Sequence, residues 1–299
     1  MEATRKGELL MLLTSLLAAA GWFVSRQAIE ALPVSGFIGL RFLLAALVLL
    51  PFCWRDIAAN FTLTARNGLL TGGLLGAGLL LWIYAVAVSP TLSEGGFITS
   101  LAMLFVPLLN WLFFRNRPPL AFWLGLPLVL AGLMLLSLQG SWNFASGHIW
   151  FAASSLLMSL FFIVNSRLAP HLPVLPFSCA QLLVVGVMGL LVSLATETWP
   201  ERISAAGIGW LLVSVLPATV LRYVVQIAGQ RLAAPVTAAL IMLLEPVWVL
   251  LFSLLIYQEP FSPQKQLACA LMFIGLLITR SRLFGRRNTL SKPLTNPEP

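Results

Sequence analysis

Charged residues are scarce in this 299-residue chain: they make up 9% of it, while 59% of its residues are hydrophobic. A soluble domain carries roughly 25% charged residues, and no soluble domain of this length could bury so much apolar surface. The apolar runs are continuous, whereas the strands of a membrane β-barrel alternate apolar and polar residues. The composition therefore predicts an all-α polytopic membrane protein.

Histidine and cysteine are scarce as well. The three cysteines (Cys53, Cys179 and Cys269) include no CxxC pair, so they indicate neither a disulfide framework nor a zinc site. The two histidines, His148 and His171, lie near segment ends without a metal-binding motif. No apolar segment offers the central histidine or paired aspartates of an intramembrane enzyme, and no GxxxxGK[ST] loop indicates an ATPase. We therefore expect that the protein is not an enzyme and that it binds no metal and no cofactor.

The formal net charge of +8 takes its meaning from where the charges lie. Ten apolar segments can be marked, at about 8–28, 34–53, 67–88, 92–114, 119–138, 147–167, 174–196, 207–230, 234–257 and 264–282. With a cytoplasmic N-terminus, 13 of the 18 lysines and arginines fall in inside loops and tails and three in outside loops. This positive-inside bias predicts ten spans with both termini cytoplasmic, and it argues against nucleic acid as a partner. Residues 284–299 are predicted to be a disordered cytoplasmic tail.

An internal repeat divides the chain. The block Leu32–Phe37 recurs as Leu172–Phe177 at an offset of 140, and Pro107 matches Pro246 at an offset of 139. Each half, 1–140 and 141–283, contains five segments, so the two halves enter the membrane in opposite directions. Such inverted repeats are typical of secondary transporters, whose binding site lies near the midplane between the halves.

Two stretches resemble a known family. Leu32–Phe52 (LPVSGFIGLRFLLAALVLLPF) is similar to the second helix of EamA-type transporters of the drug/metabolite transporter superfamily, with its proline, Arg-Phe pair and Ala/Leu run. Leu243–Ile278 is similar to the family's ninth and tenth helices, with a Glu-Pro pair, Glu259 at the connecting turn and Gly275 late in the tenth helix. The resemblance extends over about residues 8–282.

The sequence departs from the family pattern at two places. Gly21-Trp22 stands about a turn later than the usual Trp-Gly, and Arg115-Asn116-Arg117 replaces the glutamate expected at the turn between helices four and five. The resemblance implies two EamA-type five-helix repeats, 1–140 and 141–283. It also implies export, without ATP, of amino acids or related small metabolites across a bacterial inner membrane, as in the YddG-like exporters.

Two ionisable residues lie deep inside apolar segments. Glu245 is near the middle of Ala233–Tyr257 and is followed by Pro246. Intramembrane charges are candidates for function: Glu245 would bind a substrate amine, carry a proton or pair with an arginine, or else anchor a neighbouring helix. Arg222 shares a helix face with Gln226 and would bind a carboxylate or pair with Glu245, or else form a structural ion pair.

Three further polar positions suit a gating or structural role. Arg41 and its repeat mate Gln181 are predicted to donate hydrogen bonds that hold helices or loops together. Glu94, near the outer end of its segment, would cap that helix, where a carboxylate suits the N-terminal dipole, or else belong to an outer gate.

Aromatic and helix-breaking residues complete the candidate set. Trp22, Trp82 and Tyr84 fall on segments one and three, which would line a cavity by family resemblance, and Asn165 on segment six is a further cavity candidate. Aromatic faces there would suit an aromatic side chain or a cation. Pro107, Pro217 and Pro246 are expected to break or bend their helices, and Gly68, Gly72 and Gly76 form a face for close helix packing.

The functional hypothesis is a secondary transporter working on a small molecule in the lipid bilayer, with protons as a possible coupling ion. Arg222, Glu245 and aromatic lining would suit an amino acid. A lipophilic cation would need the glutamate but not the arginine, so a multidrug efflux carrier stays an alternative, as does a passive facilitator.

Overall fold

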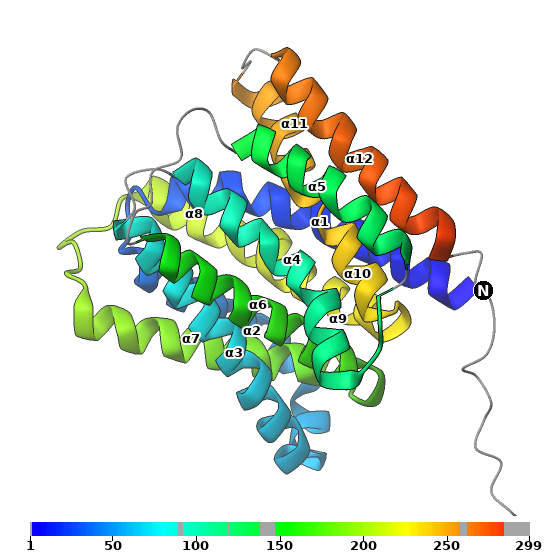
Figure 1. Cartoon of the computed structure of the whole chain (residues 1–299). Coiled ribbons are helices and arrows are strands. Elements are labelled where there is room, and N and C mark those ends of the chain that lie inside the picture. Colours follow the sequence, from blue (N-terminus) through cyan, green and yellow to red (C-terminus); the bar gives the residue numbers. More distant parts are fainter. Residues whose placement is uncertain (1, 89–91, 119, 138–146, 258–261, 284–299) are drawn as a thin grey trace, which may run out of the picture.

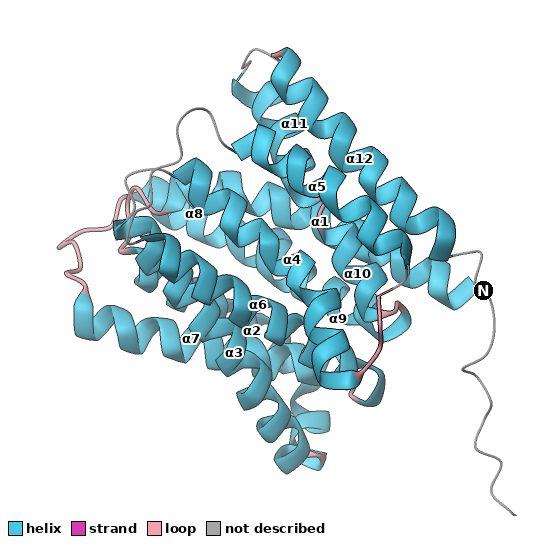
Figure 2. Cartoon of the chain, viewed as in Figure 1, coloured by secondary structure: helices cyan, strands magenta, loops and turns pink. Residues whose placement is uncertain are grey.

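The computed structural model describes residues 2–283 except 89–91, 119, 138–146 and 258–261, and within that part it is helical, with no strand (Figures 1 and 2). In chain order the elements are α1 Glu2–Ala28, α2 Val34–Ala59, α3 Phe61–Val88, α4 Leu92–Phe114, α5 Leu120–Ser137, α6 Gly147–Leu168, the 3-10 turn η1 Ala169–His171, α7 Val174–Thr196, α8 Ala205–Val215, the π-helix η2 Leu216–Leu221, α9 Arg222–Leu232, α10 Pro235–Met242, α11 Glu245–Tyr257 and α12 Pro263–Leu283. The predicted tail 284–299 and Glu259 lie outside the described residues.

The apolar helices confirm a polytopic α-helical membrane protein. Six stretches of the described chain are long and apolar enough to cross a bilayer, namely Glu2–Ser25, Val34–Ala59, Phe61–Ala85, Gly147–His171, Val174–Thr196 and Ala205–Leu232. Shorter apolar helices, Ile98–Phe114, Leu120–Leu135, Pro235–Val249 and Gln266–Ile278, lie in the remaining predicted segments. Ten crossings and the cytoplasmic location of both termini stay predictions.

Two predicted segments depart from a regular α-helix. Segment 207–230 divides into α8, η2 and α9, with Pro217 inside the π-helix. Segment 234–257 divides into α10 and α11: the N–H groups of Leu243 and Leu244 bond to carbonyls three residues back, at 3.3 and 3.0 Å. Pro246 has no N–H to donate to the preceding turn, so it cannot restore a hydrogen bond across this break. By contrast, α4 runs unbroken through Pro107.

The second helix is longer than its hydropathy indicates. The apolar segment predicted at about 34–53 lies within α2, which continues to Ala59. The hydrophobic run stops at the charged pair Arg55-Asp56, but a helix continues through charged residues once it leaves the apolar core. Asn60 alone separates α2 from α3, and Figure 1 shows the two helices projecting together beyond the bundle.

Glycine allows α2 and α7 to cross backbone against backbone. A Cβ built on Gly39 would lie 2.5 Å from the backbone nitrogen of Leu190, and one on Gly189 would lie 2.8 Å from Cα of Gly39. No side chain fits between the two helices there. The predicted glycine face of α3 (Gly68, Gly72 and Gly76) also packs on α7. Helix α7 therefore lies between α2 and α3 and contacts both of them closely.

A second glycine contact joins α5 to α12, which lie along one edge of the bundle (Figure 1). Cβ atoms built on Gly132 and Gly275 would meet backbone oxygens of the opposite helix at 2.7 and 2.9 Å. In a five-plus-five repeat, α2 corresponds to α7 and α5 to α12. Each of these two contacts would therefore join a helix to its counterpart in the other half, and both are made through glycine.

Candidate functional site

Arg41 is buried in α2, with 7% of its surface exposed, and it ties three helices together. Its Nη1 donates to Oγ of Ser25 on α1 at 2.7 Å, and its Nη2 donates to the carbonyl of Ala218 in η2 at 2.6 Å. Nε donates to the Thr219 hydroxyl. Three of its five donors are thus used inside the protein.

The partners of Arg41 are themselves satisfied. Ser25 Oγ donates to the Gly21 carbonyl at 2.6 Å, and Thr219 Oγ1 donates to the Ser214 carbonyl at 3.1 Å. A π-helix leaves carbonyls without their usual i+4 donors, and here Arg41 and Thr219 supply the missing hydrogens. The geometry matches the tethering role expected for Arg41.

A second, neutral network surrounds Gln181 on α7. Its Nε2 donates to Oγ1 of Thr71 on α3 at 2.9 Å and to Oδ1 of Asn165 on α6 at 2.5 Å. Asn165 Nδ2 in turn donates to Gln230 on α9. All four side chains are at most 1% exposed, so this network crosses the bundle interior without contact with solvent or lipid.

The predicted repeat would make the two networks equivalent. Arg41 and Gln181 differ by 140 in number, and so do their partners Ser25 and Asn165. Arg41 joins α2 to α1 and η2, and Gln181 joins α7 to α6 and α3. An inverted repeat relates these helix sets to each other. Asn165 therefore lies within a buried hydrogen-bond network, where the sequence placed it on a cavity wall.

Arg222, Tyr223 and Gln226 form the polar face of α9, directly after the π-helix. Tyr223 and Gln226 are 3% and 4% exposed, and the guanidinium carbon of Arg222 lies 5.1 Å from the Tyr223 ring centroid. Nε of Arg222 is buried and has no hydrogen-bond partner among the described residues. Buried polar groups are normally hydrogen-bonded, so this face is an exception that calls for a ligand or water.

Glu245 is the first residue of α11, immediately after the break in the ninth segment. A carboxylate there lies in the positive end of the α11 dipole. Its pairing with Arg222 stays a prediction. Trp248, one turn on, donates from Nε1 to Ser15 Oγ on α1 at 3.1 Å and holds α11 against the first helix.

The remaining candidates are less closely associated. Trp82 is half-buried and packs against two separate clusters of buried hydrophobic side chains. Tyr84 is 51% exposed, and its ring meets that of Trp150 edge-on at 5.2 Å. The side chains of Trp22 and Glu94 lie outside the described residues, although Glu94 stands in the first turn of α4.

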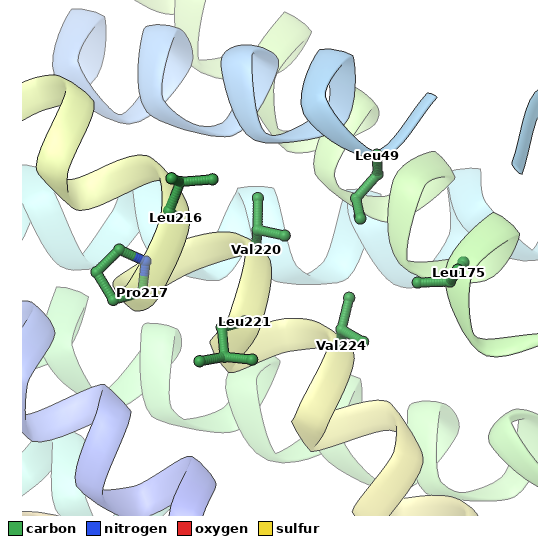
Figure 3. A pocket seen from close by; sticks show the side chains of 7 residues that line it. All are labelled: Leu49, Leu175, Leu216, Pro217, Val220, Leu221 and Val224. Atoms are coloured by element: carbon green, nitrogen blue, oxygen red, sulfur yellow. The ribbon is translucent and has the colours of Figure 1, made fainter. Parts of the chain in front are cut away.

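The hollow shown in Figure 3 is not the predicted polar cavity. It has a volume of about 430 Å³ and is lined by apolar side chains of α2, α7, η2 and α9: Leu49, Leu175, Leu216, Pro217, Val220, Leu221 and Val224. Of the candidates named from the sequence, Pro217 lines it, but none of the predicted polar or aromatic site residues does. Its exposed members, including Leu216 and Leu221, face outward from the bundle, where a hydrocarbon environment suits them.

One buried polar contact was missed by the sequence reasoning. Glu197, just beyond α7, accepts hydrogen bonds from the backbone N–H groups of Ser35 at 2.9 Å and Gly36 at 3.0 Å, in the first turn of α2. Partial burial works against ionisation of this carboxyl, but the nearby Ser193 hydroxyl and the two N–H groups more than offset it, so the pKa of Glu197 is lowered. Glu197 thus clamps the start of α2 to the end of α7.

Comparison with known proteins shows which family the chain matches. A family model described as the EamA-like transporter family matches residues 5–138 and, a second time, residues 145–281. The chain is similar to Protein PecM of Dickeya dadantii (strain 3937), with 29% identity over 121 residues, which is 40% of this chain and 40% of PecM. It is also similar to a solved crystal structure at a TM-score of 0.75, with 20% identity over 94% of this chain and 98% of the other. At that identity the likeness shows the fold alone.

Proposed function

The chain belongs to the EamA-like transporter family, and from this premise we propose that it is a secondary transporter that exports amino acids or related small metabolites. Export would cross a bacterial inner membrane by alternating access between two inverted five-helix repeats, 1–140 and 141–283. The polar face of α9 and the break before α11 would form the substrate site.

The unpartnered guanidinium of Arg222 is the observation that carries this proposal. Its Nε is buried without a hydrogen-bond partner in the described part of the chain. Arg41 is held by three internal bonds, whereas Arg222 has donors to spare. A substrate carboxylate would satisfy the planar guanidinium with two parallel hydrogen bonds.

Glu245 supplies the opposite charge. At the N-terminus of a discontinuous helix it resembles the half-helix ends that contact substrate in other transporter folds. A carboxylate there would bind a substrate amine or exchange a proton with it, so that an amino acid would be held at both ends. The Gln226 amide, one turn from Arg222, would complete the carboxylate contact.

A lipophilic-cation efflux carrier is the second candidate, and it makes a different demand on these residues. A cation needs Glu245 but is repelled by Arg222. The half-buried Trp82 would suit such a substrate through its aromatic face. Substitution of the arginine therefore separates the two candidates.

The test is efflux from proteoliposomes loaded with labelled amino acids or with tetraphenylphosphonium, with and without a pH gradient. For the proposed function, R222Q and E245Q should each lower amino-acid efflux at least tenfold, since one buried charge-assisted contact contributes about 1.5–3 kcal/mol. R231Q is the matched control, because Arg231 lies on the same helix but is exposed in its last turn.

Each outcome supports a different candidate function. Loss of amino-acid efflux in R222Q but not R231Q supports the carboxylate site, and loss of the response to pH in E245Q supports proton exchange. Phosphonium efflux that is kept or increased in R222Q would favour the cation carrier. Efflux that ignores pH and both substitutions would indicate facilitated diffusion with Glu245 as a structural residue.

A further inference from the structure

The ends of α4 and α6 meet at a surface that the proposed transport function does not use. Arg167, in the last turn of α6, lies with its guanidinium carbon 4.2 Å from the ring centroid of Phe114, the last residue of α4. Its Nη2 donates to Oδ1 of the buried Asn110 at 3.0 Å. One arginine is thus fixed in place beside the loop that follows α4, with further donors facing outward.

Two more arginines follow at once. Arg115 has a left-handed backbone with φ 55°, the conformation that commonly ends a helix, and Arg117 comes two residues later. Both side chains are exposed, and no described residue forms an ion pair with them. The sequence has no Asp or Glu from residue 95 to residue 168, which covers nearly all of α4 and all of α5 and α6. The positive charge of this corner is uncompensated.

An aromatic surface continues from the arginines along α4 and α5. Trp111 and Trp123 are 40% and 41% exposed and meet edge-on at 6.2 Å, and Phe113 is 58% exposed. Exposed aromatic rings on a membrane helix lie at the level of the lipid headgroups. We call Arg115, Arg117, Arg167 and these three rings the arginine–aromatic rim.

We propose that the arginine–aromatic rim binds an anionic phospholipid, with the phosphate among the three guanidinium groups and an acyl chain along the Trp111–Trp123 surface. Arginine pairs with phosphate through two parallel hydrogen bonds, and basic pockets between membrane helices on the cytoplasmic side recognise anionic headgroups. The proposal rests on the proposed cytoplasmic orientation of this end of the bundle, and it is independent of the substrate.

The test is a lipid titration of the purified protein in mild detergent, with bound lipids counted by native mass spectrometry. Dioleoylphosphatidylglycerol should bind more tightly than dioleoylphosphatidylcholine. Each exposed arginine near a lipid surface strengthens anionic binding about fivefold, so R115Q/R117Q should weaken phosphatidylglycerol binding roughly 25-fold and leave phosphatidylcholine unchanged. These two substitutions remove no described internal contact, so the fold should be kept.

R55Q is the matched control. Arg55 lies on α2, 5.4 Å from the ring centroid of the exposed Trp54, and is a single arginine beside a single tryptophan. R55Q should bind phosphatidylglycerol as the wild type does, and R115K/R117K should fall between, since lysine keeps the charge but not the planar fork. Equal affinities of R115Q/R117Q and R55Q, or of the two lipids for the wild type, would overturn the proposal. Because no substrate is present, this result is separate from the efflux assay.

Discussion

The clamp between Glu197 and the first turn of α2 predicts a defined loss of stability. Glu197→Ala removes a carboxylate that accepts two backbone hydrogen bonds at a helix N-terminus. Loss of a capping side chain costs about 0.5–2 kcal/mol, and loss of the charge–dipole interaction about 0.3–1 kcal/mol. We expect a cost of about 2 kcal/mol for Glu197→Ala and about 1 kcal/mol for Glu197→Gln, which keeps one acceptor oxygen.

The assay is thermal unfolding in detergent, followed with a thiol-reactive dye. Cys53 and Cys179 are buried in the folded protein and become reactive when it unfolds. At roughly 2–4 °C per kcal/mol, a scale measured on soluble domains of 150–250 residues, Glu197→Ala should lower the midpoint by about 4–8 °C. Asp56→Ala is the control, because Asp56 is an exposed carboxylate near the opposite end of α2.

The pH dependence has a fixed sign. The folded-state pKa of Glu197 lies below its ordinary value of 4.5, so the clamp stabilises the protein fully above that value and is lost as the pH falls through the folded pKa. The gap between wild type and Glu197→Gln should be constant from neutral pH down to about pH 5.5 and should close in stronger acid. A gap that widens on acidification, or equal midpoints for Glu197→Ala and Asp56→Ala at neutral pH, would refute this reasoning.

Three further predictions concern the packing that holds the site. Arg41→Gln should lower the unfolding midpoint more than Glu197→Ala, because each buried acceptor left without a donor costs about 1–3 kcal/mol, and Arg41→Lys should recover part of the loss. Gly39→Ala should destabilise the α2–α7 contact severely, since its Cβ would lie 2.5 Å from a backbone nitrogen, whereas Gly73→Ala, with nothing within 4 Å, should be neutral or stabilising. Pro246→Ala returns an N–H to the broken helix, so it should raise the midpoint and slow efflux; faster efflux would mean that the break is not needed for transport.

The sequence was sufficient to predict the class of fold, because the apolar composition and the positions of the charged residues can both be read from it directly. It also located both interrupted helices, since Pro217 and Pro246 stand inside apolar runs where a missing N–H has a local consequence. It could not fix the end of α2, because the charged residues that end a hydrophobic run do not end a helix. Nor could it tell that α4 runs unbroken through Pro107.

The contacts made across the chain were out of reach of sequence reasoning. Glu197 lies in a polar loop and has no local signal; its partner Ser35 is 162 residues away in number. Arg41 was recognised as a tether, but its partners Ser25 and Thr219 are ordinary helix residues until the fold brings them to it. A hydroxyl in a membrane helix usually bonds to its own backbone, so nothing in its type reveals a distant partner.

The repeat itself indicates which polar groups serve structure and which serve transport. Arg41 and Gln181 are equivalent, both are polar, and both are hydrogen-bonded to the equivalent helices of their half. Arg222 is equivalent to Trp82 at the same offset of 140, so here the halves differ in both charge and shape. A tether is needed wherever two halves fold alike, whereas an asymmetric small molecule needs a site whose two walls are unlike. Arg222, whose Nε has no hydrogen-bond partner among the described residues, lies at a position where the repeat is broken, and for that reason it is the first residue to substitute.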